Sequence, residues 1–83
     1  MSNPNLTSEQ DIQQWLVGKV SEITNLDSNE IDIDKEIMSY GLDSSALMLV
    51  IGELSDIVKK EISMDTLQNK KTISDIAVYV SSQ

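Results

Sequence analysis

Residues 40–45 read Tyr-Gly-Leu-Asp-Ser-Ser and lead directly into an apolar run over residues 46–58. Aspartate and serine are preferred at the start of a helix because their side-chain oxygens accept hydrogen bonds from its free N–H groups. The apolar run has helical spacing, and the lysines that follow it complement the negative end of the helix dipole. The stretch therefore predicts a helix from Asp43 or Ser44 to about Lys60, with a serine hydroxyl at its start.

This predicted helix carries apolar residues on two sides. One set recurs at the spacing of a core-facing stripe and consists of Leu47, Val50, Ile51, Leu54, Ile57 and Val58. A second set lies on the opposite side and consists of Ser45, Met48, Leu49 and Gly52. A helix with two apolar faces is either fully buried or contacts a partner. Full burial is hard to reach in a short chain, so we expect partner contact, with core filling by Met48 as the alternative.

A first helix is predicted from Thr7 or Ser8 to about Asn25. Thr7 and Gln10 fit a capping box, in which two side chains satisfy free backbone donors. Apolar residues then recur at intervals of four, four and three, which is one helix face. These core-facing residues are Ile12, Leu16, Val20 and Ile23, and Trp15 is expected to cover the edge of the face.

A final helix is predicted after Thr72, which forms a second capping-box pattern with Asp75. Its buried face consists of Ile73, Ile76, Ala77 and Val80. Residues 63–67 can form a short helix between the second and the last helix, and no segment shows the alternation of a strand. The expected fold is therefore all-α: a small four-helix bundle of three longer helices and one short helix.

A long acidic loop, residues 26–43, joins the first and second predicted helices. We expect its isoleucines, Ile31, Ile33 and Ile37, to pin it across the helices, because a long structureless loop is unusual in a compact domain. A calcium loop is the alternative, but from Asp27 the ligand spacing places isoleucine at the fifth position and Asp32 where glycine is required. No metal site is therefore expected.

Composition narrows the class of protein. The chain has 83 residues, six basic against fourteen acidic, and a net charge of −8. This charge argues against nucleic acid and against anionic membrane surfaces, and it favours basic protein partners. No apolar run approaches the length of about 20 residues that spans a membrane, and the absence of cysteine fits a cytoplasmic protein. We expect a frayed tail over residues 1–6 and one domain over residues 7–82.

Ser44 does not fit a self-contained hydrolase. A serine nucleophile needs a base, usually histidine, and this chain has none. The Gly-x-Ser-x-Gly elbow is also missing, because Asp43 and Ser45 flank Ser44. Helix capping alone is the simpler interpretation, but it explains neither the preceding Gly-Leu nor the second apolar face.

Four segments together resemble acyl carrier proteins of the polyketide type over nearly the whole chain. They are Trp-Leu-Val at 15–17, Ile-Asp-Ile-Asp at 31–34, Tyr-Gly-Leu-Asp-Ser at 40–44 and Thr-Ile-Ser-Asp-Ile-Ala at 72–77. The resemblance implies a phosphopantetheine arm on Ser44, installed from coenzyme A by a phosphopantetheinyl transferase to which Asp43 presents the serine. The arm's thiol would hold acyl groups as thioesters, so the chain would be a carrier and not an enzyme. Ser45 departs from the family, in which leucine is more usual at this place.

In this family the helix after the modified serine docks onto partner enzymes. The residues expected to contact partners are Leu42, Ser45, Met48, Leu49, Gly52, Glu53 and Asp56. The carriers of fatty acid synthesis place acids along this face, whereas here apolar residues lie near Ser44. A possible acyl pocket comprises Leu47, Val50, Ile51 and Leu54, with a closed core as the alternative.

The resemblance implies a monomer that is loaded by an acyl-AMP ligase or an acyltransferase. Ketosynthase or condensation enzymes of polyketide, lipopeptide or fatty acid synthesis would then use the cargo. Two alternatives stay open: a peptidyl carrier of nonribosomal peptide synthesis, and a helical interaction module that is never modified.

Overall fold

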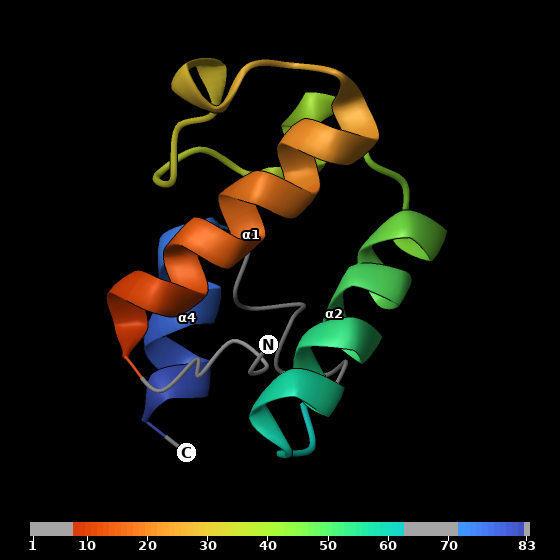
Figure 1. The fold of residues 1–83 in the computed structure, drawn as a ribbon. Coiled ribbons are helices and arrows are strands. Elements are labelled where there is room, and N and C mark those ends of the chain that lie inside the picture. Colours follow the sequence, from red (N-terminus) through yellow and green to blue (C-terminus); the bar gives the residue numbers. More distant parts are fainter. Residues whose placement is uncertain (1–7, 63–71, 83) are drawn as a thin grey trace, which may run out of the picture.

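Three α-helices and two short 3₁₀ helices form the described part of the chain, residues 8–62 and 72–82 of a computed structural model (Figure 1). They are α1 (Glu9–Thr24), η1 (Ser28–Glu30), η2 (Ile37–Tyr40), α2 (Ser44–Val58) and α4 (Ile73–Ser81). The all-α class is as predicted. The predicted short helix at 63–67 and the tail at 1–6 lie outside the described residues, so the four-helix bundle stays a prediction.

Helix α1 begins at Glu9, one residue after Ser8, the later of its two predicted starts. Its N-cap is Ser8, whose Oγ accepts a hydrogen bond from the Asp11 N–H at 3.1 Å. The predicted Thr7–Gln10 capping box includes Thr7, which lies outside the described residues. The helix ends at Asn25, which adopts the left-handed conformation at φ 62°. This conformation is tolerated by asparagine better than by most residues, so the predicted end is confirmed.

The inner face of α1 supplies three fully buried side chains, Ile12, Leu16 and Val20. Ile23 was predicted on the same face, but 46% of its surface is exposed. The chain turns at Asn25, and Leu26 packs against the core beyond the turn. The buried stripe of α1 is thus one turn shorter than the pattern predicts.

Helices α2 and α4 complete the described core. The buried residues of α2 are Val50, Ile51 and Leu54, and those of α4 are Ile73, Ile76, Ala77 and Val80. Thr72 caps α4 by accepting a hydrogen bond from the Asp75 N–H at 3.0 Å. Helices α1 and α4 pack most closely, while α2 stands beside them (Figure 1).

The loop over residues 25–43 crosses the end of the molecule where α1 ends and α2 begins (Figure 1). Ile31 and Ile37 are buried, as predicted, and Ile33 packs against the core. Two backbone contacts tie the loop to the start of α4: the Ser74 N–H donates to the Ile33 carbonyl at 3.0 Å, and Glu36 forms an isolated antiparallel bridge with Thr72. The loop is therefore a fixed part of the fold. None of the described helices is long and apolar enough to cross a membrane.

Candidate functional site

The start of α2 is shaped by three consecutive residues with different tasks. Gly41 takes the left-handed conformation at φ 90°, which glycine adopts without steric cost. Leu42 inserts into the core with 4% of its surface exposed. Asp43 is the N-cap: its Oδ1 accepts from the Ala46 N–H at 2.8 Å, and its carbonyl accepts from the Leu47 N–H at 3.0 Å. This sequence of turn, anchor and cap determines where the helix begins.

Ser44 is the first residue of α2 and is exposed. Within residues 8–62 and 72–82, no side chain or backbone group forms a hydrogen bond with its hydroxyl. The cap of the helix is supplied by Asp43, so Ser44 is not needed for capping. Its Oγ is free to form a bond with an incoming group.

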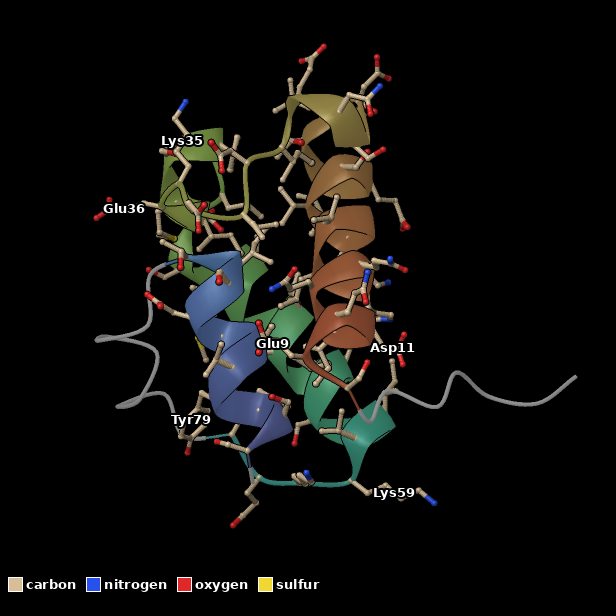
Figure 2. The ribbon with its side chains drawn as sticks, turned by 90° about the vertical axis from the view of Figure 1, so that its left-hand side faces the viewer. Glu9, Asp11, Lys35, Glu36, Lys59 and Tyr79 are labelled. Carbon is tan, nitrogen blue, oxygen red and sulfur yellow. The ribbon has the colours of Figure 1, made fainter. Side chains whose placement is uncertain are left out.

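Histidine, the usual base for a serine nucleophile, is absent from the chain. Lys35 places its Nζ over the Tyr40 ring, 5.8 Å from the centroid. Lys59 lies toward the opposite end of the molecule and extends away from it (Figure 2). No group of three acidic, histidine or cysteine side chains among the described residues could hold a metal.

The site fits the phosphopantetheine that the family resemblance implies. The group would be joined to Ser44 Oγ through a phosphate, which has to lie at the start of α2. The positive end of a helix dipole stabilises an anion there by about 0.3–1 kcal/mol at exposed positions. Because Ser44 is exposed, the arm would extend into solvent without displacing core residues.

The outer face of α2 exposes most of the predicted partner residues. Met48 is 54% exposed and Leu49 is 70% exposed. The other exposed members of the set are Ser45, Gly52, Glu53 and Asp56. Leu42 is a correction: its side chain anchors the turn in the core, so it cannot form part of an exposed contact surface.

Glu53 is engaged within the molecule. Its Oε2 lies 2.7 Å from Lys19 Nζ of α1, and this lysine also lies over the Trp15 ring, 5.6 Å from the centroid. The hydrogen bond that the Lys19 ammonium donates to Glu53 is the main cause that raises the pKa of Lys19 above its usual value. The sequence did not indicate this contact, because pairing between helices cannot be read from spacing within one helix.

The predicted acyl pocket is part of the packed core. Val50, Ile51 and Leu54 are buried, and Leu47 is half-buried. A hollow of about 600 Å³ lies beside α2, and among the described residues it is lined by Met48, Ile51, Gly52, Ser55, Glu61, Ile62 and Tyr79. Among the described residues, this hollow shares only Ile51 with the predicted pocket.

Tyr40 was not predicted as a site residue. Its hydroxyl accepts a hydrogen bond from the Asp32 N–H at 2.6 Å and donates one to the Asp32 carbonyl at 3.0 Å. The two residues are eight positions apart in a loop without periodicity. No pattern in the sequence indicates such a contact.

Comparison with known families gives a match to the one described as "Phosphopantetheine attachment site", over residues 14–80. Among curated proteins, the chain is 26% identical over 80 residues to the acyl carrier protein TtuC of Teredinibacter turnerae, covering 96% of this chain and 91% of that protein. It is 29% identical over 80 residues to the probable polyketide synthase 42 of Dictyostelium discoideum. That match covers 90% of this chain and 3% of the synthase.

Two solved structures share the fold. A free-standing peptidyl carrier protein from Acinetobacter baumannii superposes with a TM-score of 0.81 at 29% identity, covering 92% of this chain and 95% of that one. An acyl carrier protein from Anabaena sp. PCC 7120, with a variant phosphopantetheinylation-site sequence, superposes with a TM-score of 0.87 at 27% identity. That match covers 99% of this chain and 93% of the Anabaena protein.

Proposed function

This chain belongs to the phosphopantetheine attachment site family and is an acyl carrier protein with covalently attached phosphopantetheine, and on this premise we propose that Ser44 carries the arm. The observation that supports the proposal most is the free, exposed hydroxyl of Ser44 at the first residue of α2. Ser45 is also exposed, but it lies one residue after the serine of the Gly-Leu-Asp-Ser pattern.

The chemistry requires little of this chain. Ser44 Oγ attacks the phosphorus atom of the phosphopantetheine unit in coenzyme A, and the diphosphate P–O bond breaks. Adenosine 3′,5′-bisphosphate leaves, and the serine proton passes to a base on the phosphopantetheinyl transferase. Asp43 holds the first turn of α2 in place, which presents the hydroxyl to the transferase. The chain itself is then a non-catalytic shuttle.

The carrier domain spans residues 7–82, acts as a cytoplasmic monomer and delivers acyl groups to enzymes of polyketide, lipopeptide or fatty acid synthesis. The similarity to a polyketide synthase supports the first of these pathways. An acyl-AMP ligase or acyltransferase loads the arm, and a ketosynthase or condensation enzyme takes the cargo.

Partner enzymes dock on the outer face of α2, led by apolar contact near Ser44. Met48 and Leu49 are the exposed large apolar residues of this face. Glu53 is held by Lys19, so a basic partner has to compete with an internal cation for that carboxylate. Asp56 lies roughly 18 Å along the helix axis from Ser44, at 1.5 Å per residue, and contributes steering from a distance.

The acyl pocket at Leu47, Val50, Ile51 and Leu54 stays a prediction. Three of these residues are buried, and entry of an acyl chain requires them to move apart. The alternative is a closed core with cargo held outside it.

A second candidate function is that of a peptidyl carrier with an aminoacyl cargo. The specific observation in its favour is the structural similarity to the free-standing peptidyl carrier protein from Acinetobacter baumannii. The two functions are distinguished by incubating the protein that carries the phosphopantetheine arm, but no cargo, with a panel of acyl-AMP ligases and adenylation domains. An acyl carrier takes its cargo from a ligase, and a peptidyl carrier takes it from an adenylation domain.

The proposal is tested by incubating the protein with coenzyme A and a promiscuous phosphopantetheinyl transferase and measuring the intact mass. We expect the wild type to gain the mass of one arm. Ser44→Ala is expected to abolish the gain, and the matched control Ser45→Ala to keep it. A wild-type protein that gains no mass would instead favour the unmodified interaction module.

A further inference from the structure

Tyr40 uses its hydroxyl as a two-point clamp on the backbone of Asp32. The hydroxyl accepts from the Asp32 N–H at 2.6 Å and donates to the Asp32 carbonyl at 3.0 Å. A hydroxyl is suited to this task because it is both a donor and an acceptor. Two bonds to one residue fix both the position and the direction of that piece of backbone relative to the tyrosine ring.

Asp32 is itself a fixed point of the loop. Its Oδ1 accepts from the Asp34 N–H at 2.9 Å, and its carbonyl also accepts from the Lys35 N–H at 3.2 Å. On one side, Ile31 is buried, and on the other, the Ile33 carbonyl accepts from Ser74 of α4. The clamp therefore joins Tyr40 to a part of the loop that is anchored to the core and to α4.

The other side of the clamp leads to Ser44 in four residues. Gly41 follows Tyr40 in the left-handed conformation, and glycine is the residue with the widest conformational freedom. Freedom at this position would let the segment before α2 adopt several directions. Tyr40 on one side and the buried Leu42 on the other restrict it.

From this geometry we infer that Tyr40 is a positioning residue for arm transfer: it holds the segment before α2 in the one conformation that presents Ser44 to the transferase. The inference rests on the proposed attachment of the arm to Ser44. Tyr40 is not proposed to contact coenzyme A or the reacting oxygen of Ser44; it acts through residues 41–43.

The test is the substitution Tyr40→Phe, which keeps the ring and removes both hydrogen bonds. When the segment samples other conformations, only the competent fraction binds the transferase, so the apparent KM for the carrier rises in inverse proportion to that fraction. Two hydrogen bonds of the usual net strength together favour the clamped conformation by about fivefold or more, so we expect KM to rise at least about threefold. The kcat should stay unchanged, because the bound complex is the same.

Tyr79→Phe is the matched control, since it removes a hydroxyl from a half-buried tyrosine of α4, away from the clamp. Its transfer kinetics should match those of the wild type. Both variants are assayed at a temperature where they are folded. A rise in KM that is found only for Tyr40→Phe then cannot come from a general loss of stability.

Amide hydrogen exchange, measured by NMR, gives a second readout that does not depend on transfer. The Asp32 amide should exchange slowly in the wild type and faster in Tyr40→Phe, while the Asp75 amide, bonded to Thr72, should not change. Unchanged KM in folded Tyr40→Phe, or fast exchange of Asp32 in the wild type, would overturn the inference. A wild type that accepts no arm would instead overturn the attachment at Ser44, so the two failures are distinct.

Discussion

At the scale of single residues, Asp43 and Ser44 divide the tasks at the start of α2. The Asp43 carboxylate accepts from the Ala46 N–H, which stabilises the first turn. Because the cap is provided by its neighbour, Ser44 keeps a free and exposed hydroxyl. One residue thus gives the helix its start, and the other remains available for modification.

Asp43→Ala is expected to lower the free energy of unfolding by about 0.5–2 kcal/mol, because the Ala46 N–H loses its acceptor. Asp43→Asn should cost much less, since an amide oxygen caps nearly as well. Urea denaturation of the two variants measures the difference. Equal losses for both would show that the carboxylate acts through its charge and not as a cap.

Residue identity allowed the start of α2 at Asp43 and Ser44 to be predicted, because capping preference depends on the type of these adjacent residues. Leu42 was wrongly assigned to the exposed contact surface, since the pattern does not reveal which side of a turn a side chain takes. Tyr40 was missed because its bonds reach the backbone of Asp32, and every residue type except proline would offer the same N–H and carbonyl at position 32.

At the scale of elements, α2 has an inner face that packs and an outer face that stays exposed. Val50, Ile51 and Leu54 are buried on one side, while Met48 and Leu49 are exposed. The spacing predicted both faces, because all these residues belong to one regular helix. The two 3₁₀ helices and the loop contacts with α4 were not predicted in detail, since they depend on backbone groups distant in sequence.

Leu49→Glu should weaken transfer of cargo from whichever ligase or adenylation domain loads the wild type. A charge placed in an apolar contact is expected to raise KM by about fivefold or more. Stability should change little, because the Leu49 side chain is 70% exposed.

Val78→Glu is the control for that substitution, because Val78 is an exposed apolar residue of α4 at 47% exposure. Loading of this variant should equal that of the wild type. Equal loading of Leu49→Glu would refute docking through the outer face of α2, and a defect in both variants would indicate a general effect of the added charge.

The ion pair between α1 and α2 gives a prediction for pH. Hydrogen bonding to Glu53 raises the pKa of Lys19, so the contribution of the pair to stability is present below the unfolded pKa of 10.5 and is lost as the pH rises through the folded pKa. The difference in Tm between wild type and Lys19→Met should therefore be constant from pH 7 to about 9 and vanish at higher pH.

Glu53→Gln should give the same pH behaviour, and the double variant should lose no more than either single variant. Thermal unfolding across the pH series measures all three. Additive losses in the double variant would mean that the two side chains do not stabilise the protein as a pair.

At the scale of the whole molecule, the loop over residues 25–43 connects the helices and also belongs to the core. Ile31 and Ile37 are buried with residues of α1, α2 and α4 in one cluster. A domain of this size is marginally stable, with about 5–15 kcal/mol available in typical cases. The fold that carries Ser44 therefore depends on Ile31 and Ile37 of the loop as well as on the helices.

Ile37→Ala is expected to lower the free energy of unfolding by about 2–5 kcal/mol, because the side chain is only 1% exposed and truncation leaves a cavity. Ile23→Ala is the matched control, with 46% exposure, and should cost only a small part of that. Denaturant unfolding compares the two variants. A similar small loss in both would contradict the packing of the loop into the core.

The residue that carries the phosphopantetheine arm is identified most directly by fragmenting the protein after the arm has been attached. Cleavage after Lys35 and Lys59 gives a peptide of residues 36–59 with four serines, at positions 39, 44, 45 and 55. Tandem mass spectrometry of this peptide should place the arm on Ser44. An arm on Ser45, or on any other residue, would contradict the account.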